Sequence, residues 1–178
     1  MIRVTKEEIC RLLPQFNLIR DAQLKDTALS MWQEACGRSD WESLEAIPFG
    51  PGYDPVRAGF LHHVALGTQY SYVVAMAYNE LEPVPVNVDY VVAGALLHDV
   101  SKIVEYSSEG GRTAWGTHVS HAVYGVVLCE KYGLPIEITH IVASHTAKLG
   151  MPNKSPEAII VAKADGIAAG CVHLFEDK

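Results

Sequence analysis

The stretch Ala95-Leu96-Leu97-His98-Asp99-Val100-Ser101-Lys102 sets a histidine and an aspartate inside an apolar segment. Side chains three or four positions apart share one face of a helix. The face of Asp99 carries four apolar neighbours, namely Val92, Ala95, Leu96 and Ile103. A buried carboxylate is costly unless it is paired, hydrogen-bonded or bound to a cation. We therefore expect a polar site in the protein interior at this point of the chain.

Other segments repeat this conflict between a polar residue and an apolar face. Each of four more helical segments places one imidazole or carboxylate among apolar neighbours: His63, His121, His145 and Asp165. Any one of them could be a core histidine or half of a buried salt bridge. Taken together they indicate convergence on one site. Imidazoles and carboxylates bind divalent metals, and the core of a helical bundle is a common place for such a site.

Capping signals predict helices along the N-terminal part of the chain. Thr5-Lys-Glu-Glu8 is a capping box for a helix that ends at Pro14, and a second helix is expected over Asp21–Cys36. Ser39-Asp-Trp-Glu42 is another capping box, which predicts a short helix running to Ile47-Pro48. The turn-rich stretch Pro48–Pro55 then separates a helical N-terminal extension, residues 1–50, from a main domain, residues 51–178.

The main domain is expected to be helical throughout. The predicted segments are Val56–Leu81, Asn87–Tyr106, Thr117–Tyr132 with Gly133 as its C-terminal cap, Pro135–Ala147, and a last helix that Ser155-Pro156-Glu157 begins. Alternating strand patterns are absent from the sequence, so the predicted fold class is all-α.

The pattern resembles the HD-domain superfamily of metal-dependent phosphohydrolases. Ala95–Lys102 is similar to the His-Asp signature of that superfamily, and an upstream helical His63, the segment His121-Ala-Val-Tyr-Gly125 and the pair Ala164-Asp165 complete the pattern. The resemblance covers about Val56–Val172. It implies an HD-domain-like helical bundle with a metal site in its core.

The resemblance also implies which residues hold the metal. The minimal set is His63, His98, Asp99 and Asp165, and members that hold two metals add two histidines, which correspond here to His121 and His145. The aspartate of the His-Asp pair, Asp99, bridges the two metals in such members. The expected cofactor is one or two divalent ions of Fe, Mn, Ni, Co or Zn.

Two of these assignments have a neighbouring alternative. His62 and His63 point about 100° apart on a helix, so only one of them can face the site. We favour His63, whose face carries Gly67 and Val74. His118 and His121 share a face, and we favour His121 because Gly125 follows it as in the family pattern.

The residues expected to contact substrate are basic. Ser101 stands where the superfamily pattern has glycine, whereas Lys102 is retained, so Asp99 and Lys102 are the expected catalytic residues. Lys102 is also the first choice as the cation for a substrate phosphate, although a solvated helix lysine would look the same in the sequence. The weaker candidates for substrate contact are Arg57, Arg112, His118 and Lys148.

The expected function is hydrolysis of a small phosphate ester, either a nucleotide, a cyclic phosphate or a phosphorylated metabolite, by a metal-activated water. Two alternatives stay open: a di-iron oxygenase, because some relatives of the fold use the same ligand set for O₂ chemistry, and a regulatory module with a vestigial metal site. With 14 Lys and Arg against 21 Asp and Glu, the net charge is −7, which disfavours long nucleic acids as partners.

Further expectations concern compartment and assembly. No apolar run has the length of a membrane span, the N-terminus has no signal-peptide pattern, and the four cysteines are scattered, so we expect a cytoplasmic protein that does not engage a membrane. The predicted helix over 21–36 has an apolar face, which we interpret as a surface where a homodimer could form. Its residues are Leu24, Ala28, Met31, Trp32 and Ala35.

Overall fold

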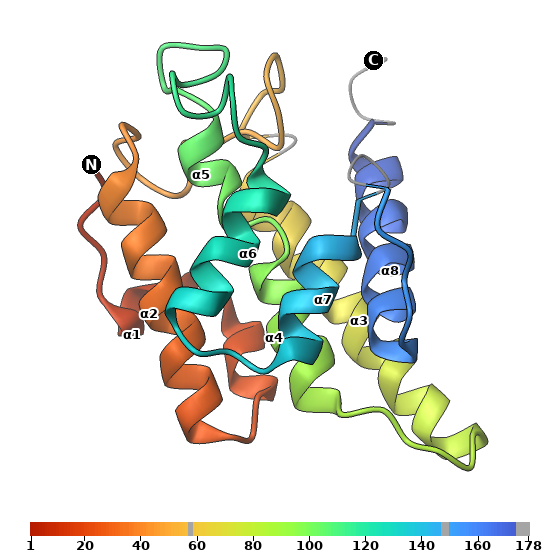
Figure 1. The fold of residues 1–178 in the computed structure, drawn as a ribbon. Helices are drawn as coiled ribbons and strands as arrows, with labels where there is room; N and C mark the ends of the chain where they lie inside the picture. Colours follow the sequence, from red (N-terminus) through yellow and green to blue (C-terminus); the bar gives the residue numbers. More distant parts are fainter. Residues whose placement is uncertain (57–58, 147–149, 174–178) are drawn as a thin grey trace.

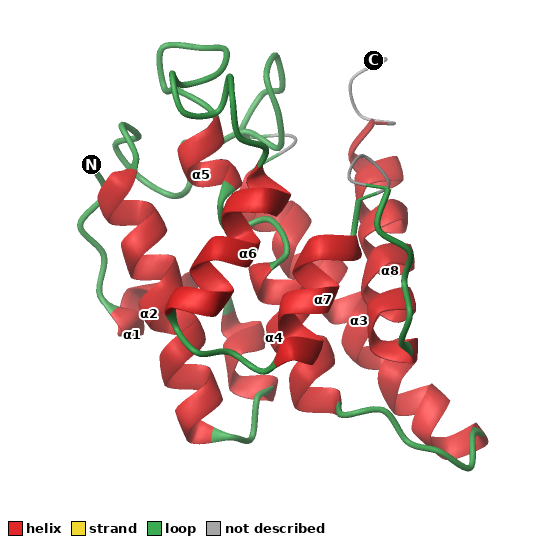
Figure 2. Ribbon diagram, viewed as in Figure 1, coloured by secondary structure: helices red, strands yellow, loops and turns green. Residues whose placement is uncertain are grey.

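The computed structural model is all-α and describes residues 1–56, 59–146 and 150–173 (Figures 1 and 2). Its elements are α1 (Lys6–Leu12), the 3₁₀ helix η1 (Pro14–Leu18), α2 (Ala22–Arg38), α3 (Phe60–Leu81), α4 (Val88–Leu97), α5 (Lys102–Glu105), α6 (His121–Lys131), α7 (Ile136–Ser144) and α8 (Pro156–His173). The described residues form no strand, only the isolated bridges Pro48–Gly59 and Tyr106–Arg112. The predicted fold class is confirmed.

The expected caps begin several of these helices. At α1, the amide of Glu8 donates to Thr5 Oγ1 at 3.2 Å and the amide of Thr5 donates to Glu8 Oε2 at 2.7 Å, which is the predicted capping box. Asn87 caps α4 through the amide of Tyr90, and Ser155 accepts from the amide of Ala158 at the start of α8. Gly133, with φ of +64°, ends α6 as predicted.

The helix predicted after Ser39 does not form. Residues 39–48 contain no helix, because Ser39 closes α2 and does not open a new element: its hydroxyl donates to the Cys36 carbonyl at 2.9 Å. The Asp40 carboxylate accepts from the Ser107 hydroxyl at 2.6 Å and from the Ser108 amide at 3.1 Å. The capping box was a false signal because its polar groups bond to distant parts of the chain.

Two predicted helix starts were also too early. α3 begins at Phe60, not at Val56, because Gly59 has an extended backbone and bridges Pro48. α6 begins at His121, not at Thr117, because Ser120 is extended. The predicted ends at Leu81 and Tyr132 agree with the structure to within one residue.

Helix α4 is the centre of the fold. It contacts α2 and η1 on one side and α3, α7 and α8 on others, and all its residues from Val91 to Leu97 are buried (Figure 1). Trp32 of α2 donates its indole N–H to the carbonyl of Leu96 at 3.0 Å, which joins the N-terminal helices to α4. The buried C-terminal part of α4 ends deep in the protein, and this depth sets the position of His98 and Asp99.

The apolar face of α2 is part of the interior. Its residues Leu24, Ala28, Met31, Trp32 and Ala35 are all buried, in one apolar cluster with residues of α1, η1, α4 and α6. The interpretation of this face as a homodimer surface is therefore wrong, because the face is used within the chain. The division into residues 1–50 and 51–178 stays a prediction.

Two glycines, Gly94 and Gly125, allow close helix contacts, whereas a third, Gly67, is not required for one. A Cβ built on Gly94 would lie 2.7 Å from Ile141 side-chain atoms of α7, and one on Gly125 of α6 would lie 2.7 Å from Val142 Cγ1. A Cβ on Gly67 of α3 would lie 3.8 Å from Ala168 Cβ of α8, which is an ordinary contact. These contacts bring α3, α4, α6, α7 and α8 together at the level of the polar residues.

Candidate metal centre

The predicted continuous helix from Asn87 to Tyr106 is interrupted at His98–Ser101. Tight i to i+3 bonds run through this turn, with the Val100 amide on the Leu97 carbonyl at 3.2 Å and the Lys102 amide on the Asp99 carbonyl at 2.8 Å. In a continuous α-helix, neighbouring side chains diverge by about 100°. Here His98 Nε2 lies 3.3 Å from Asp99 Oδ2, so both side chains face the same site. Sequence periodicity predicted the polar pair but not this break.

One set of side chains approaches Asp99 from α3, α8 and the end of α4. His63 Nε2 of α3 lies 3.3 Å from Asp99 Oδ2 and 3.1 Å from Asp165 Oδ1 of α8. His98 Nε2 lies 3.5 Å from the same Asp165 oxygen. The ligand atoms of His63, His98, Asp99 and Asp165 all lie within 4.8 Å of one another. We call these four residues the first ligand group.

A second set approaches the other oxygen of Asp99. His121 Nε2, at the start of α6, lies 3.3 Å from Asp99 Oδ1, and His145 Nε2, just after α7, lies 3.5 Å from the same oxygen. These three ligand atoms also lie within 4.8 Å of one another. We call Asp99, His121 and His145 the second ligand group. The structure thus brings all six predicted metal ligands together, with Asp99 common to both groups.

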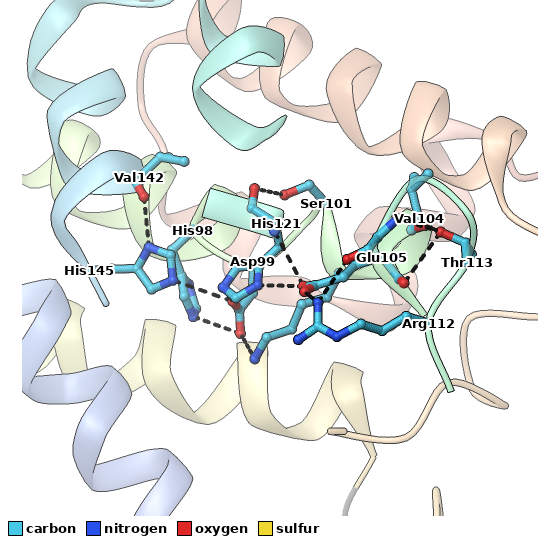
Figure 3. Close-up of polar contacts among 12 residues, drawn as sticks. His98, Asp99, Ser101, Val104, Glu105, Arg112, Thr113, His121, Val142 and His145 are labelled. Carbon is cyan, nitrogen blue, oxygen red and sulfur yellow. Dashed lines mark hydrogen bonds and ion pairs between the residues drawn. The ribbon is translucent and has the colours of Figure 1, made fainter. Parts of the chain in front are cut away.

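Three of the four imidazoles are oriented by acceptors behind them, and Figure 3 shows those of His121 and His145. His98 Nδ1 lies 2.6 Å from the Ala95 carbonyl and His145 Nδ1 lies 2.7 Å from the Val142 carbonyl. His121 Nδ1 lies 2.6 Å from Glu105 Oε2. Carbonyls and ionised carboxylates only accept, so each Nδ1 carries the proton and each Nε2 is directed at Asp99. This arrangement is typical of histidines that bind a metal through Nε2.

The cluster has the features of a cation site. Within the described part of the chain, His63 Nε2, His98 Nε2 and Asp99 Oδ1 are buried without a hydrogen-bond partner. Buried polar atoms are normally satisfied, so three unsatisfied atoms that converge need an explanation. A divalent ion would satisfy them, and a mixture of imidazole and carboxylate ligands suits borderline transition metals. The residues present therefore fit a metal.

Electrostatics favour the charged forms of Asp99 and His98 and the neutral form of His145. Burial alone would raise the pKa of Asp99, but Lys102 and His98 outweigh it and hold the pKa well below the ordinary value. Burial would lower the pKa of His98, yet Asp99 and Asp165 raise it to about 10. The pKa of His145 is lowered by its burial. A proton on His98 is the positive charge that a metal ion would replace on binding.

Lys102 lies at the site, as expected, but it contacts a ligand. Its Nζ is 2.6 Å from Asp99 Oδ2 and 4.7 Å from the centre of the Phe49 ring. The Phe49 ring also lies 4.5 Å from the ring of His63. Sequence analysis missed Phe49, because an aromatic residue inside a turn-rich stretch carries no periodic signal.

Of the other expected substrate contacts, the structure describes only Arg112 and His118. Arg112 donates to Glu105 Oε1 and, at 3.0 Å, to the Gly116 carbonyl, so its guanidinium is already bound within the chain. His118 is exposed, as is His62, in contrast to the buried His121 and His63. Arg57 and Lys148 lie outside the described residues.

Glu105 is the main polar residue that sequence analysis missed. Glu105 is only 2% exposed. It shares a helical face with Ser101, and in the sequence a face with two polar residues looks like one exposed to solvent. The Ser101 hydroxyl donates to the His121 carbonyl at 2.6 Å, and Ser101 is buried as well. A polar pair four residues apart next to the His-Asp motif was the signal available for both.

The family model described as HD domain matches residues 58–170. The chain belongs to the HD domain family. HD domains bind divalent metals, and both ligand groups lie within the matched residues. Within the described residues, none of the helices combines the length and apolarity needed to cross a bilayer.

The relatives of this HD domain include a protein named as a cyclic phosphate phosphodiesterase and proteins named as ribonucleases. The chain is 36% identical over 112 residues to dihydroneopterin 2',3'-cyclic phosphate phosphodiesterase of Methanocaldococcus jannaschii, a match covering 60% of this chain and 45% of that protein. It is 36% identical over 84 residues to ribonuclease Y of Thermosipho melanesiensis and 34% identical over 83 residues to ribonuclease Y of Thermotoga maritima. Those two matches cover 47% of this chain and 14% of each relative, so the chain spans less than half the length of these proteins. No solved structure shows a significant match.

Proposed function

We propose that this HD domain is a metal-dependent phosphohydrolase that acts on a small phosphate ester. The observation that carries the proposal is the convergence of four imidazoles and two carboxylates on one buried point, with Asp99 common to two ligand groups. Among small esters, a cyclic phosphodiester is the first substrate class to test, because one relative is named for that chemistry.

When bound, a metal would supply Lewis acidity toward a phosphoryl oxygen and would lower the pKa of a water molecule, so that the water could act as the nucleophile at neutral pH. The chain's own residues prepare this chemistry. The Nε2 atoms of the four histidines and the oxygens of Asp99 and Asp165 would hold one or two ions of Fe, Mn, Ni, Co or Zn, and the acceptors behind His98, His121 and His145 keep the lone pairs directed inward.

The substrate approaches beside Asp165. The side chain of Asp165 is 21% exposed, whereas His63, His98 and Asp99 are at most 2% exposed. Lys102, with a side chain 15% exposed, carries its ammonium next to Asp99 and can face a phosphate oxygen once a metal neutralises that carboxylate. This supports the assignment of Asp99 and Lys102 to the catalytic machinery.

The test is a panel of substrates under anaerobic conditions. Protein reconstituted with Mn²⁺ or Co²⁺ should hydrolyse a 2',3'-cyclic nucleotide or a phosphomonoester and leave a single-stranded RNA oligomer intact, given the net charge of −7. Cleavage of the RNA alone would overturn the small-molecule assignment. Turnover that requires O₂ would identify an oxygenase, and a protein that binds no metal would be a regulatory module. Cytoplasmic location stays a prediction from the sequence. The expectation of a homodimer rested on the apolar face of α2, which is buried within the chain.

A further inference from the structure

Glu105 lies behind His121, on the side of the ring away from Asp99 (Figure 3). Its Oε2 accepts from His121 Nδ1 at 2.6 Å and from the His121 backbone amide at 3.3 Å, while His121 Nε2 faces Asp99 Oδ1 at 3.3 Å. One carboxylate oxygen therefore holds both the ring and the backbone of His121. Its acceptor-only character leaves the Nε2 lone pair free for a metal.

The other oxygen of Glu105 is held by the following loop. Arg112 donates to Oε1, and the same guanidinium nitrogen donates to the Gly116 carbonyl at 3.0 Å. A Cβ on Gly116 would lie 2.1 Å from the Glu105 carbonyl oxygen, so the loop touches α5 closely. Arg112, whose predicted contact with substrate stays a prediction, is the counter-ion of this buried carboxylate.

Ser101, the residue just before α5, also holds His121, whereas Glu105 is the last residue of that helix. Its buried hydroxyl donates to the His121 carbonyl at 2.6 Å. Ser101 and Glu105 are four residues apart, so both reach α6 from one face of α5. The structure thus explains the serine at the position where the HD pattern has glycine.

We propose that Glu105, fixed by Arg112 and assisted by Ser101, is a positioning residue that orients His121 for the second ligand group. The inference rests on the proposed metal site. Hydrogen bonds of this type orient the ring and increase its basicity, and their removal typically weakens metal binding about 10- to 100-fold. The first ligand group has no contact with Glu105 among the described residues, so the effect is confined to one of two metal positions.

The experiment compares Glu105→Ala and Glu105→Gln with Glu34→Ala as the matched control. The Glu34→Ala change also removes an acceptor for one cation and one neutral donor, because Glu34 Oε2 accepts from Lys131 at 2.6 Å and from the Tyr132 hydroxyl at 2.8 Å. Glu34 lies on α2 and belongs to neither ligand group. Each protein is titrated with Co²⁺ alone. In the metal-free protein, long-range ¹⁵N–¹H spectra at about pH 8, above the ordinary imidazole pKa of about 6.5, report the His121 tautomer.

We expect wild type and Glu34→Ala to bind two Co²⁺ and to hold His121 with its proton on Nδ1. Glu105→Ala should bind the second Co²⁺ about 10- to 100-fold more weakly and lose the single tautomer. Glu105→Gln keeps an acceptor oxygen and should lose less. If Glu105→Ala does not fold, Glu105→Gln and Arg112→Ala decide the matter in the same two measurements.

Unchanged Co²⁺ binding together with an unchanged tautomer would overturn the positioning role. A wild-type protein that binds no Co²⁺ would instead overturn the proposed function, and the tautomer would then decide by itself whether Glu105 orients His121.

Discussion

The two ligand groups share Asp99 but are built in different ways. In the first, His63 lies in the first turn of the long helix α3 and Asp165 lies in the middle of α8, and His63 Nδ1 has no hydrogen-bond partner within the described residues. In the second, His121 and His145 lie at helix ends, and both have Nδ1 held by an acceptor. Helix packing places His63 and Asp165, whereas hydrogen bonds hold the rings of His121 and His145, as one also holds the ring of His98.

The space around the two groups also differs. Gly67 on α3 leaves an ordinary van der Waals distance to Ala168, whereas Gly125 on α6 leaves no room for a methyl group beside Val142. Long helices in broad contact can absorb a small change, but helix ends joined by short turns move with their side chains. We therefore expect the second group to respond more strongly to conservative changes.

The largest effect should come from removing the residue that both groups share. Asp99→Ala should abolish Co²⁺ binding at both positions and lower phosphohydrolase activity about 1000-fold or more, because metal-ion stabilisation is worth several kcal/mol. The measurement is metal content together with turnover. Asp89→Ala on the same helix is the control, since the Asp89 carboxylate accepts from the backbone amides of Arg20 and Asp21 and belongs to neither ligand group. Full metal retention in Asp99→Ala would contradict the role of Asp99.

Removing one histidine from each group should separate the two positions. His145→Ala should leave one Co²⁺ bound through the first group. His63→Ala should lower the affinity of the first group for Co²⁺ and leave the second group intact, because the two groups share only Asp99. Calorimetric titration measures both. His140→Ala serves as the control, since His140 Nε2 accepts from the Lys154 amide and lies outside both groups. Identical losses in the two site variants would show that the groups act as one.

A matched pair of glycine variants tests the difference in packing. Gly125→Ala should destabilise the fold by about 1–3 kcal/mol, because its Cβ meets Val142 Cγ1 at 2.7 Å. Gly67→Ala should be neutral or stabilising by up to about 1 kcal/mol, because alanine is the better helix former and its contacts are ordinary. Urea unfolding of the metal-free proteins measures both, and equal destabilisation would remove the distinction.

The smallest expected effect concerns the hydroxyl of Ser101. Ser101→Ala should cost about 0.5–1.5 kcal/mol of unfolding free energy, the usual worth of one hydrogen bond. It should also lower the affinity for the second Co²⁺ by less than tenfold and leave the affinity for the first unchanged. Ser71→Ala is a close control, because Ser71 is a buried serine on α3 whose hydroxyl donates to the Gly67 carbonyl at 2.8 Å. If both serine variants change Co²⁺ binding equally, Ser101 has no special relation to His121.

Local sequence signals predicted most of the helices and the six residues that meet at the centre. Polar residues on apolar faces are informative because a buried polar group is costly unless it contacts a polar partner. His63 and His98, for example, both contact Asp165. The same kind of signal failed at Ser39–Glu42. A capping box depends only on local residue types, and it cannot show that Asp40 bonds to Ser107.

By itself, the sequence determined the all-α class, the capped helix starts and the set of imidazoles and carboxylates, because helix periodicity and the cost of burial act locally. Tertiary structure alone decided which oxygen of Asp99 meets which group, that Arg112 neutralises Glu105 and that Glu105 holds His121. Apart from the adjacent pair His98 and Asp99, these contacts join residues 7 to 46 positions apart in sequence, counting from 112 − 105 to 145 − 99. Their geometry depends on how α5, α6 and α7 pack, which no local pattern records.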